Sequence, residues 1–553
     1  MTSPTSPTGE PESAEPPSPG LARSTAIQAA GTALSRITGF GRIFAFAYAL
    51  GAGRLADTYT LANNTPNIIY ELILGGVLSG TLLPVFVREL RGSANGDEAE
   101  RRGWRAVSAV FTLAVVAASV LALAFVVVAP LFIRLYTLRN GREVSGAQVA
   151  VATDLLRLFA PQVFFYGMIS VTTAIVRARR KFAAPMFAPV LNNVVLIGLF
   201  LAYPSVVGTR SLEGVRGDRD AVLLLGLMTT AGVAAMALVQ FPFRIARRHL
   251  RWVWAPGHPA VRTIVRLSGW TVAFVLANQV ALFVVYLLAN GRPGDVTVYF
   301  LTYTIFLLPH GVVSVSIISA VQPELADRWA AGDLAGFRSQ LSVGIRSIAA
   351  LLIPAVGGYI ILARPIIAAL LEHGALEDAG ADRVAATLAL MSIGLPAFSC
   401  WLFLTSAYQA MQNTRSLFFL YLAENGANIV AAVVLYPAMG VRGLGLAFAI
   451  AYFTGSGAAL ADLRRRTGGV DGLVLTGSLL RILAATAVMA VAALVVSRFL
   501  AGGGGFGGAV DAGVSTVAGV TVYLLACKAF GVRELRSFVP FRRRSWSVGG
   551  SSR

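Results

Sequence analysis

Residues 35–86 read SRITGFGRIFAFAYALGAGRLADTYTLANNTPNIIYELILGGVLSGTLLPVF, and this stretch decides the fold. It belongs to two apolar blocks, 24–50 and 57–87. Each block is long enough to cross a bilayer, because a spanning helix needs about 20 apolar residues. Arg36 and Arg42 lie inside the first block, where a charged side chain costs about 2.5–3.5 kcal/mol to insert. The stretch therefore predicts membrane helices with a polar interior surface.

The composition of the whole chain agrees with a membrane protein. Of its 553 residues, 56% are hydrophobic and 13% are charged, against about 45–50% and about 25% in soluble domains. A soluble core cannot hide so much apolar surface, which excludes soluble enzymes, disordered proteins and fibrous repeats. The net charge of +19 comes mostly from residues between the apolar blocks. This distribution indicates loops facing an anionic leaflet, and we expect no nucleic-acid partner.

Apolar blocks of spanning length continue to residue 530. We expect an all-α integral membrane protein with about fourteen transmembrane helices, at 24–50, 57–87, 105–134, 149–176, 183–203, 220–242, 262–290, 295–323, 340–363, 384–411, 416–437, 442–462, 473–499 and 509–530.

The two ends of the chain differ from this body. Residues 1–23 are rich in Pro, Ser, Thr and Glu and contain no apolar run, which predicts a disordered cytosolic tail. Residues 531–553 form a basic tail. Either tail could dock partner proteins. If both ends are cytosolic, the inner loops carry 22 Arg and Lys residues and the outer loops 12, as the positive-inside rule requires.

An internal repeat appears at an offset of 235 residues. It maps Pro161 onto Pro396, Arg180 onto Arg415 and Asn193 onto Asn428, each time with a basic turn between two helices. Repeats of this kind are typical of transporters. We therefore predict an N-lobe at 24–242 and a C-lobe at 262–462, each with six helices. The two helices at 473–530 lie outside the duplicated body.

Polar residues inside the spans are the candidates for a binding site. Arg42 suits a cavity better than the membrane interface, whereas for Arg36 a cavity and snorkelling to the interface stay equally open. The first lobe also carries polar residues that packing alone does not explain: Asp57, Asn67, Glu71 and Arg157.

A second group of polar residues lies in the other lobe. Glu424 and Asn428 are spaced i,i+4 on one face of a predicted helix, and Asn278 lies on the first helix of the same lobe. Carboxylate and amide oxygens suit a sodium ion or a proton site. An interhelical hydrogen bond in which Glu424 is permanently neutral is the alternative.

Catalytic signatures are lacking in the sequence. It contains no Walker A motif, four scattered histidines, and two cysteines within apolar stretches, Cys400 and Cys527. We therefore expect no catalytic residues, no firm metal site and no cofactor other than a possible coupling ion. The prediction is a transporter without covalent chemistry.

The sequence resembles the MurJ/MviN family, whose signature reads SR-x-x-GF-x-R, then GAG-x-x-x-DA, then PN. Further matches are FAAPMFAPVLNNVVLIG, LLPHGVVSVSIISAVQPELA and LLEHGAL, so the resemblance covers residues 24–530. It implies the multidrug/oligosaccharidyl-lipid/polysaccharide exporter fold, with two six-helix lobes and two further helices that form a lipid groove. Arg36, Arg42 and Asp57 match family positions needed for function, with the arginines as diphosphate binders. Related flippases also hold a cation between the helices that carry Asn278 and Glu424.

The resemblance further implies a function. Such proteins flip lipid II, the undecaprenyl-diphosphate-linked peptidoglycan precursor, from the cytosolic to the outer leaflet of the bacterial plasma membrane by alternating access. The chain departs from many relatives, which have arginines at the positions of Tyr70, Glu71 and Thr304 and a glutamate at that of Gly75. The resemblance also implies cell-wall synthesis or division proteins as partners that either tail could dock. Alternatives are a flippase for another polyprenyl-linked glycan, a drug exporter of the same superfamily, and a membrane scaffold for cell-wall enzymes.

Overall fold

The computed structural model describes residues 19–71, 81–91, 97–138, 142–179, 181–469, 472–500, 506–532 and 534. Within these ranges every long element is a helix and no strand occurs, which confirms the all-α prediction. The helices are α1 (Pro19–Leu50), α2 (Arg54–Glu71), α3 (Leu83–Arg91), α4 (Asp97–Tyr136), α5 (Arg142–Phe159), α6 (Pro161–Ala178), α7 (Ala183–Val206), α8 (Leu212–Gly217), α9 (Arg219–Gln240), α10 (Phe243–His249), α11 (Pro259–Ala289), α12 (Asp295–Ala330), α13 (Leu334–Leu371), α14 (Asp378–Ser392), α15 (Leu395–Ala410), α16 (Thr414–Met439), α17 (Val441–Thr467), α18 (Gly472–Leu500) and α19 (Phe506–Phe530).

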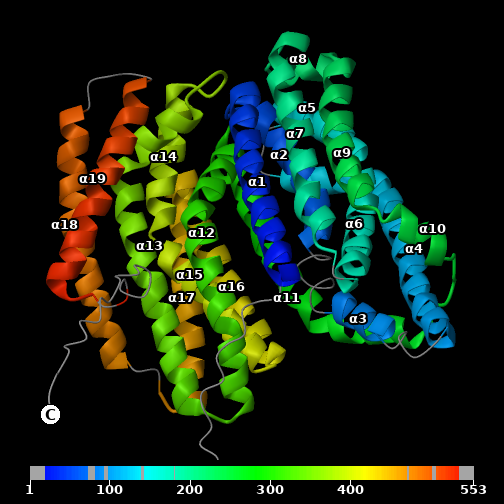
Figure 1. Cartoon of the computed structure of the whole chain (residues 1–553). Helices are drawn as coiled ribbons and strands as arrows, with labels where there is room; N and C mark the ends of the chain where they lie inside the picture. The colour runs from blue at the N-terminus through cyan, green and yellow to red at the C-terminus, as the bar shows by residue number, and fades with distance from the viewer. Residues whose placement is uncertain are drawn as a thin grey trace, which may run out of the picture.

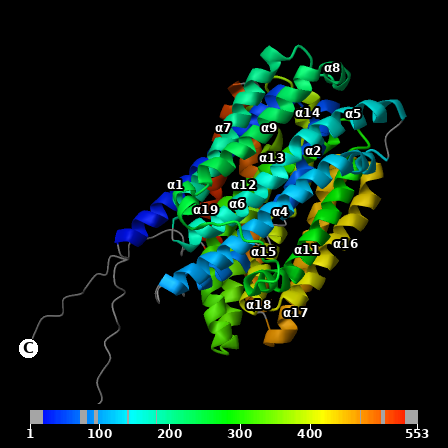
Figure 2. The same ribbon diagram turned by 90° about the vertical axis from the view of Figure 1, so that its right-hand side faces the viewer.

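The helices form two lobes that stand side by side (Figures 1 and 2). In the first lobe α1 packs on α7, α7 on α9, and α4 on α6. In the second lobe α12, α13 and α14 pack together, and α16 packs on α17. The pair α18–α19 packs on α13, on the side of the second lobe away from the first (Figure 1). This is the predicted arrangement of two lobes and two extra helices.

Ten helical stretches of the described chain are long and apolar enough to span a membrane, or eleven if the bent pair α14–α15 is one span. Their outward faces are apolar: on α4, for example, Val127 is 76% exposed. Such surface is compatible with lipid and not with water. The chain is therefore a multi-pass membrane protein, although the expected number of fourteen spans is not confirmed.

Two predicted spans contain a turn at equivalent places, but they differ in how sharply they bend. The predicted helix 149–176 has a turn at Ala160, between α5 and α6, and still runs on as one span, Gly146–Ala178. The predicted helix 384–411 is divided into α14 and α15, which meet at 52°. Pro161 and Pro396 each lie in the first helical turn after these positions, where proline's missing N–H costs no hydrogen bond. The repeat seen in the sequence thus places a proline-marked turn in each lobe, and the sharp bend is in the second.

Some predicted features lie outside the described residues. These include Arg180 of the repeat, residues 72–80 of the predicted helix 57–87, and most of the two tails, at 1–18, 533 and 535–553.

Candidate functional site: a polar cavity between the lobes

A cavity of about 630 Å³ lies between the two lobes and is lined by both. The first lobe contributes residues mainly from α1, α2, α6 and α7, and the second from α11, α12, α16 and α17. Its polar lining consists largely of amides and tyrosines, with few charges: Arg42, Asn64, Asn67, Tyr70, Glu71, Tyr166, Asn192, Asn193, Asn278, Gln279, Tyr286, Tyr299, Tyr303, Asn425, Asn428 and Tyr452. A cavity of this kind suits a large, hydrated, hydrogen-bonding ligand.

Arg42 and Glu71 are the two charged residues among the described residues that line the cavity. Arg42 lies on α1 near Gly39, and Glu71 is the last residue of α2. Neither side chain forms an ion pair with a described residue. The arginine fork is therefore available to an anion such as a phosphate, and the carboxylate to a cationic group.

The wall next to these charges is ordered by tyrosines. The Tyr166 hydroxyl donates to Asn67 Oδ1 at 2.8 Å, and the Tyr70 ring centroid lies 4.6 Å from that of Tyr166. This contact joins α6 to α2 and orients the Asn67 amide in the cavity lining. The structure therefore brings together Arg42, Asn67 and Glu71 of the predicted site.

Behind the cavity in the second lobe lies a buried carboxylate. Glu424 is 1% exposed, and its Oε2 atom has no hydrogen-bond partner among the described residues. The same holds for the side-chain oxygens of Asn428 and Gln279, both of which line the cavity. A buried carboxylate without a partner must be neutralised by a proton or by a cation. The oxygen atoms left without donors fit either, while no group of three or more His, Cys, Asp or Glu residues in the described chain could hold a metal.

Asp57 does not line the cavity. It is fully buried near the start of α2 and accepts hydrogen bonds from Gly294 N at 2.6 Å, Thr297 N at 2.9 Å and Thr297 Oγ1 at 2.8 Å. These donors belong to the first turn of α12, where backbone N–H groups lack helical partners and the helix dipole favours an anion. Asp57 therefore caps a helix of the opposite lobe, which replaces the predicted contact with a headgroup.

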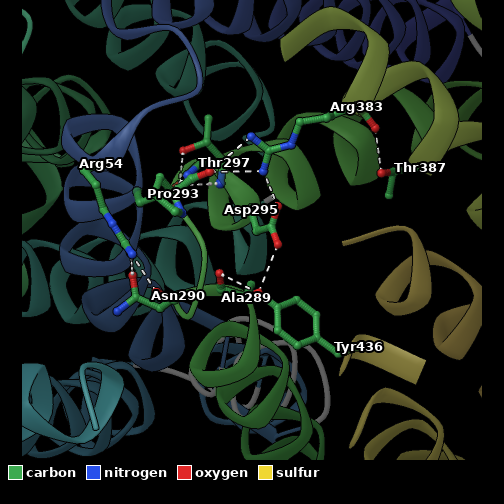
Figure 3. A network of polar contacts seen from close by, with 11 residues as sticks. Arg54, Ala289, Asn290, Pro293, Asp295, Thr297, Arg383, Thr387 and Tyr436 are labelled. Carbon is green, nitrogen blue, oxygen red and sulfur yellow. Dashed lines mark hydrogen bonds and ion pairs between the residues drawn. The ribbon is translucent and has the colours of Figure 1, made fainter. Parts of the chain in front are cut away.

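Further polar contacts surround this cap (Figure 3). Arg54 Nη1 donates to Asn290 O at 2.7 Å, which adds a further hydrogen bond between the lobes. Asp295 pairs with Arg383 and accepts from Tyr436 Oη at 3.0 Å, which fixes the start of α12 within its own lobe. We call this group the lobe latch: Arg54, Asp57, Asn290, Gly294, Asp295, Thr297 and Arg383.

The turn between α1 and α2 also meets the second lobe. Ala375 N donates to Tyr48 O at 2.9 Å. Gly294, with φ of +83°, lies against the Ala52 carbonyl, and a side chain at this position would collide with that carbonyl oxygen. The loop with Ala375 follows Glu372, whose pKa is lowered to about 2 by its hydrogen bond with Arg364. The lobes are thus held together at the end where α1 ends and α2 begins.

The structure places two more predicted site residues outside the cavity lining. Arg157 has a side chain that is 48% exposed and a weak ion pair with Asp154 at 3.8 Å. Arg36 is exposed, and its guanidinium lies against Gly311 of α12, where a Cβ atom would collide with it. Arg36 on α1 therefore contacts the second lobe beside the cavity. This contact is neither a place in the cavity lining nor snorkelling to the membrane interface, the two alternatives that the sequence left open.

Several residues of the site were not predicted. The tyrosines of the lining were missed because a tyrosine within an apolar helix gives no signal of its own. The latch had a signal: Arg54 and Asp57 recur as Arg292 and Asp295 with the same spacing, at the starts of corresponding helices of the two lobes.

Comparisons with known proteins agree with this geometry. The family model described as "Lipid II flippase MurJ" matches residues 46–510. A "Probable lipid II flippase MurJ" of Rhizobium tropici is 26% identical over 433 residues, covering 78% of this chain and 79% of the relative. The protein of the same description from Thermotoga maritima is 25% identical over 516 residues, covering 92% and 96%.

Solved structures support the same fold. A lipid II flippase MurJ in an inward closed conformation matches with a TM-score of 0.73 and 19% identity, over 93% of this chain and 99% of that one. An inward-facing multidrug resistance transporter of the MATE family matches with a TM-score of 0.62 and 14% identity, over 79% and 96%. Because the family model covers most of the sequence, including both lobes and the latch, this chain belongs to the MurJ family.

Proposed function

We propose that this chain flips lipid II across the bacterial plasma membrane for peptidoglycan synthesis. The observation that carries the proposal is Arg42, whose guanidinium forms no ion pair with a described residue and lines a polar cavity between two lobes of a MurJ-family protein. A diphosphate is a strong ligand for arginine because two N–H groups can bind it at once. The amides and tyrosines around Arg42 suit a saccharide headgroup. The protein would act as a transporter, with no covalent step.

The lobe latch supports an alternating-access mechanism. With both termini in the cytosol, the latch lies on the outer face, so the cavity is shut on that side while the latch holds. Breaking the Asp57 cap and the Arg54–Asn290 bond would let the lobes separate there. The headgroup would then reach the outer leaflet while the polyprenyl chain stays in lipid.

Glu424 supports a coupling role for sodium or protons. Glu424 lies one helical turn before Asn428 on α16, so neutralising this buried carboxylate changes the charge next to a residue that lines the cavity. Uptake of a cation or proton at Glu424 could therefore be linked to the conformation of the second lobe. Asn278, a third predicted member of this group, lines the same cavity.

A second candidate function is export of cationic drugs, favoured by Glu71 in the cavity lining and by the likeness to MATE transporters. Arg42 in the same cavity opposes a simple organic cation. A ligand with both an anionic diphosphate and a cationic group on its headgroup would satisfy both residues.

The test is replacement of Arg42 in cells that depend on this protein. We expect Arg42→Ala to abolish lipid II flipping at normal protein level, and Arg42→Lys to keep partial activity because charge remains while the fork is lost. Lipid II is measured on each leaflet after depletion of the wild type. Arg157→Ala is the matched control and should be active, because Arg157 lies outside the cavity lining. A fully active Arg42→Ala protein would remove this arginine from the cargo site, and drug efflux with normal lipid II would favour the exporter.

A further inference from the structure

A second pocket, of about 610 Å³, lies at the periphery of the first lobe, and none of its lining residues lines the central cavity. It forms where the first turns of α4 meet α10 and the segment 250–258 (Figure 1). Four exposed arginines line it, together with two acidic residues and two tryptophans: Asp97, Glu100, Arg101, Trp104, Arg105, Arg248, Arg251 and Trp252. Neither the flipping mechanism nor the latch uses any of these residues.

The pocket is a built feature because its walls are pinned to each other. Arg251 N donates to Ser108 Oγ at 3.1 Å, and Val253 N donates to Thr112 Oγ1 at 3.0 Å. Both hydroxyls belong to α4, so the segment after α10 runs along that helix. The backbone next to Arg248 and Arg251 is thereby held in place.

The floor of the pocket is aromatic. Trp104 is 5% exposed, and the His249 ring stacks on it with a centroid distance of 4.5 Å and an interplanar angle of 12°. The Arg179 guanidinium also contacts Trp104, in a cation–π contact with 5.6 Å between its Cζ atom and the ring centroid. This packing fixes α10 against α4 and α6, and so fixes the direction from which Arg248 enters the pocket.

The charge of the pocket is positive and uncompensated. Arg101, Arg105, Arg248 and Arg251 form no ion pair with any residue that the structure describes. Asp97 and Glu100 are in the first turn of α4, where the helix dipole stabilises their charge. Four guanidinium groups against two carboxylates leave an excess of positive charge for an anion to neutralise.

Two tryptophans indicate where the pocket lies relative to the bilayer. Trp252 is 65% exposed and Trp254 is 61% exposed, on the segment that borders the pocket. Exposed tryptophans are enriched where the headgroups meet the acyl chains, because the ring is both apolar and able to donate a hydrogen bond. The arginines beside them are therefore at the level of lipid phosphates.

We propose that the pocket between α4, α10 and residues 250–258 binds the phosphate headgroup of an anionic phospholipid, with Arg105, Arg248 and Arg251 as its principal ligands. Guanidinium groups match phosphate oxygens in pairs, and the exposed tryptophans would lie beside the upper acyl chains. The occupant is a membrane lipid, bound independently of the cargo in the central cavity. This inference does not depend on what the chain transports.

The test is binding of dioctanoyl phosphatidylglycerol to the purified full chain in neutral detergent, measured by titration calorimetry. We expect the double variant Arg248→Gln/Arg251→Gln to bind dioctanoyl phosphatidylglycerol at least tenfold more weakly than the wild type does. We expect dioctanoyl phosphatidylcholine to bind the wild type and the variant more weakly than phosphatidylglycerol binds the wild type. The matched control is Arg464→Gln/Arg465→Gln, which removes the same charge from exposed arginines at the end of α17 and should bind as the wild type does. An unchanged thermal unfolding temperature shows that a variant is folded. If the double variant does not fold, Arg105→Gln takes its place in the same titration.

Three results would overturn the proposal. Equal weakening in the pocket and control variants would mean that binding follows net charge alone. If the wild type bound the choline lipid as tightly as the phosphatidylglycerol, the pocket would not select a headgroup with a net negative charge. If farnesyl diphosphate binds the wild-type pocket more tightly than the phosphatidylglycerol and displaces it, the pocket is an entry site for polyprenyl-diphosphate cargo.

Discussion

At the scale of single residues, a polar residue within a membrane helix can either line the binding cavity or hold the two lobes together, and its place in the sequence does not distinguish the two roles. Asp57 and Arg42 are both polar residues within the first two helices of the chain, and the sequence predicted both as contacts of the headgroup. The structure leaves Arg42 in the cavity and engages Asp57 in three hydrogen bonds with α12. The sequence could not separate them, because the partners of Asp57 are two backbone N–H groups and the Thr297 hydroxyl, some 240 residues away in the chain.

Replacing Asp57 with Asn should loosen the latch. Asn retains one acceptor oxygen but loses the charge, and hydrogen bonds to charged groups contribute about 1.5–3 kcal/mol each. Spin labels at exposed Leu138 and Met439, one in each lobe, should therefore report a longer or broader distance distribution in the variant, in a background with both native cysteines replaced. Asp154→Asn, on the exposed side of α5, is the control and should leave the distances unchanged. Identical distributions for Asp57→Asn and the control would show that the cap does not hold the lobes.

Replacing Glu424 with Gln separates coupling from packing. Gln preserves the size of the side chain and its contact with Gly455 but cannot change charge. If Glu424 exchanges a sodium ion or proton during transport, flipping by the variant should lose its dependence on sodium or pH and slow markedly. The measurement is lipid II flipping over a range of sodium concentration and pH. Normal rates with the wild-type dependence on both would leave Glu424 as a permanently neutral clamp between helices.

At the scale of elements, hydropathy predicted where helices lie better than where they bend. Every predicted span has a helical counterpart in the described chain, but α14–α15 is bent by 52° and α5–α6 contains a turn at Ala160. An average over 20 residues cannot register a turn of one residue, although Pro161 and Pro396 marked both places. The long second-lobe helix α12 contains Pro309 and Pro323 without a break, so proline alone does not decide the outcome.

The connection between α13 and α14 gives an element-level test. Arg364 pairs with Glu372 there, and the loop that follows reaches Tyr48 of the first lobe. The pKa of Glu372 is lowered from 4.5 to about 2, so its contribution to stability is fully present above about pH 4.5 and is lost as the pH falls through about 2. We therefore expect the distance between the labels at Leu138 and Met439 to be the same at pH 8 and pH 5. Glu372→Gln should broaden it at both values, and broadening of the wild type between pH 8 and 5 would contradict this assignment.

At the scale of the whole molecule, the repeat and the latch are connected. The Arg-x-x-Asp pattern forms the first turn of α2 in one lobe and ends on the first residue of α12 in the other, and the latch contains residues of both copies. They are not used alike: Asp57 caps the helix of the opposite lobe, whereas Asp295 pairs with Arg383 of its own. Duplication thus supplied two similar helix starts, and their divergence made one of them a contact between the lobes.

The direction of transport depends on which side of the membrane the latch faces. Gly208 is exposed in the loop between α7 and α8, and α8 packs on α5, whose Gln148 donates to Asn290 of the latch. Gly257 is exposed in the loop between α10 and α11, and the membrane-spanning helix α9 separates the two loops. The loop charges predict that Gly208→Cys reacts with a membrane-impermeant maleimide in intact cells, and that Gly257→Cys reacts only after permeabilisation. The two native cysteines are replaced for this measurement, and each variant must support growth. The reverse labelling pattern would place the latch on the cytosolic face. The state seen here would then be shut toward the side on which lipid II is made, and loading would have to begin with separation of Asp57 from α12.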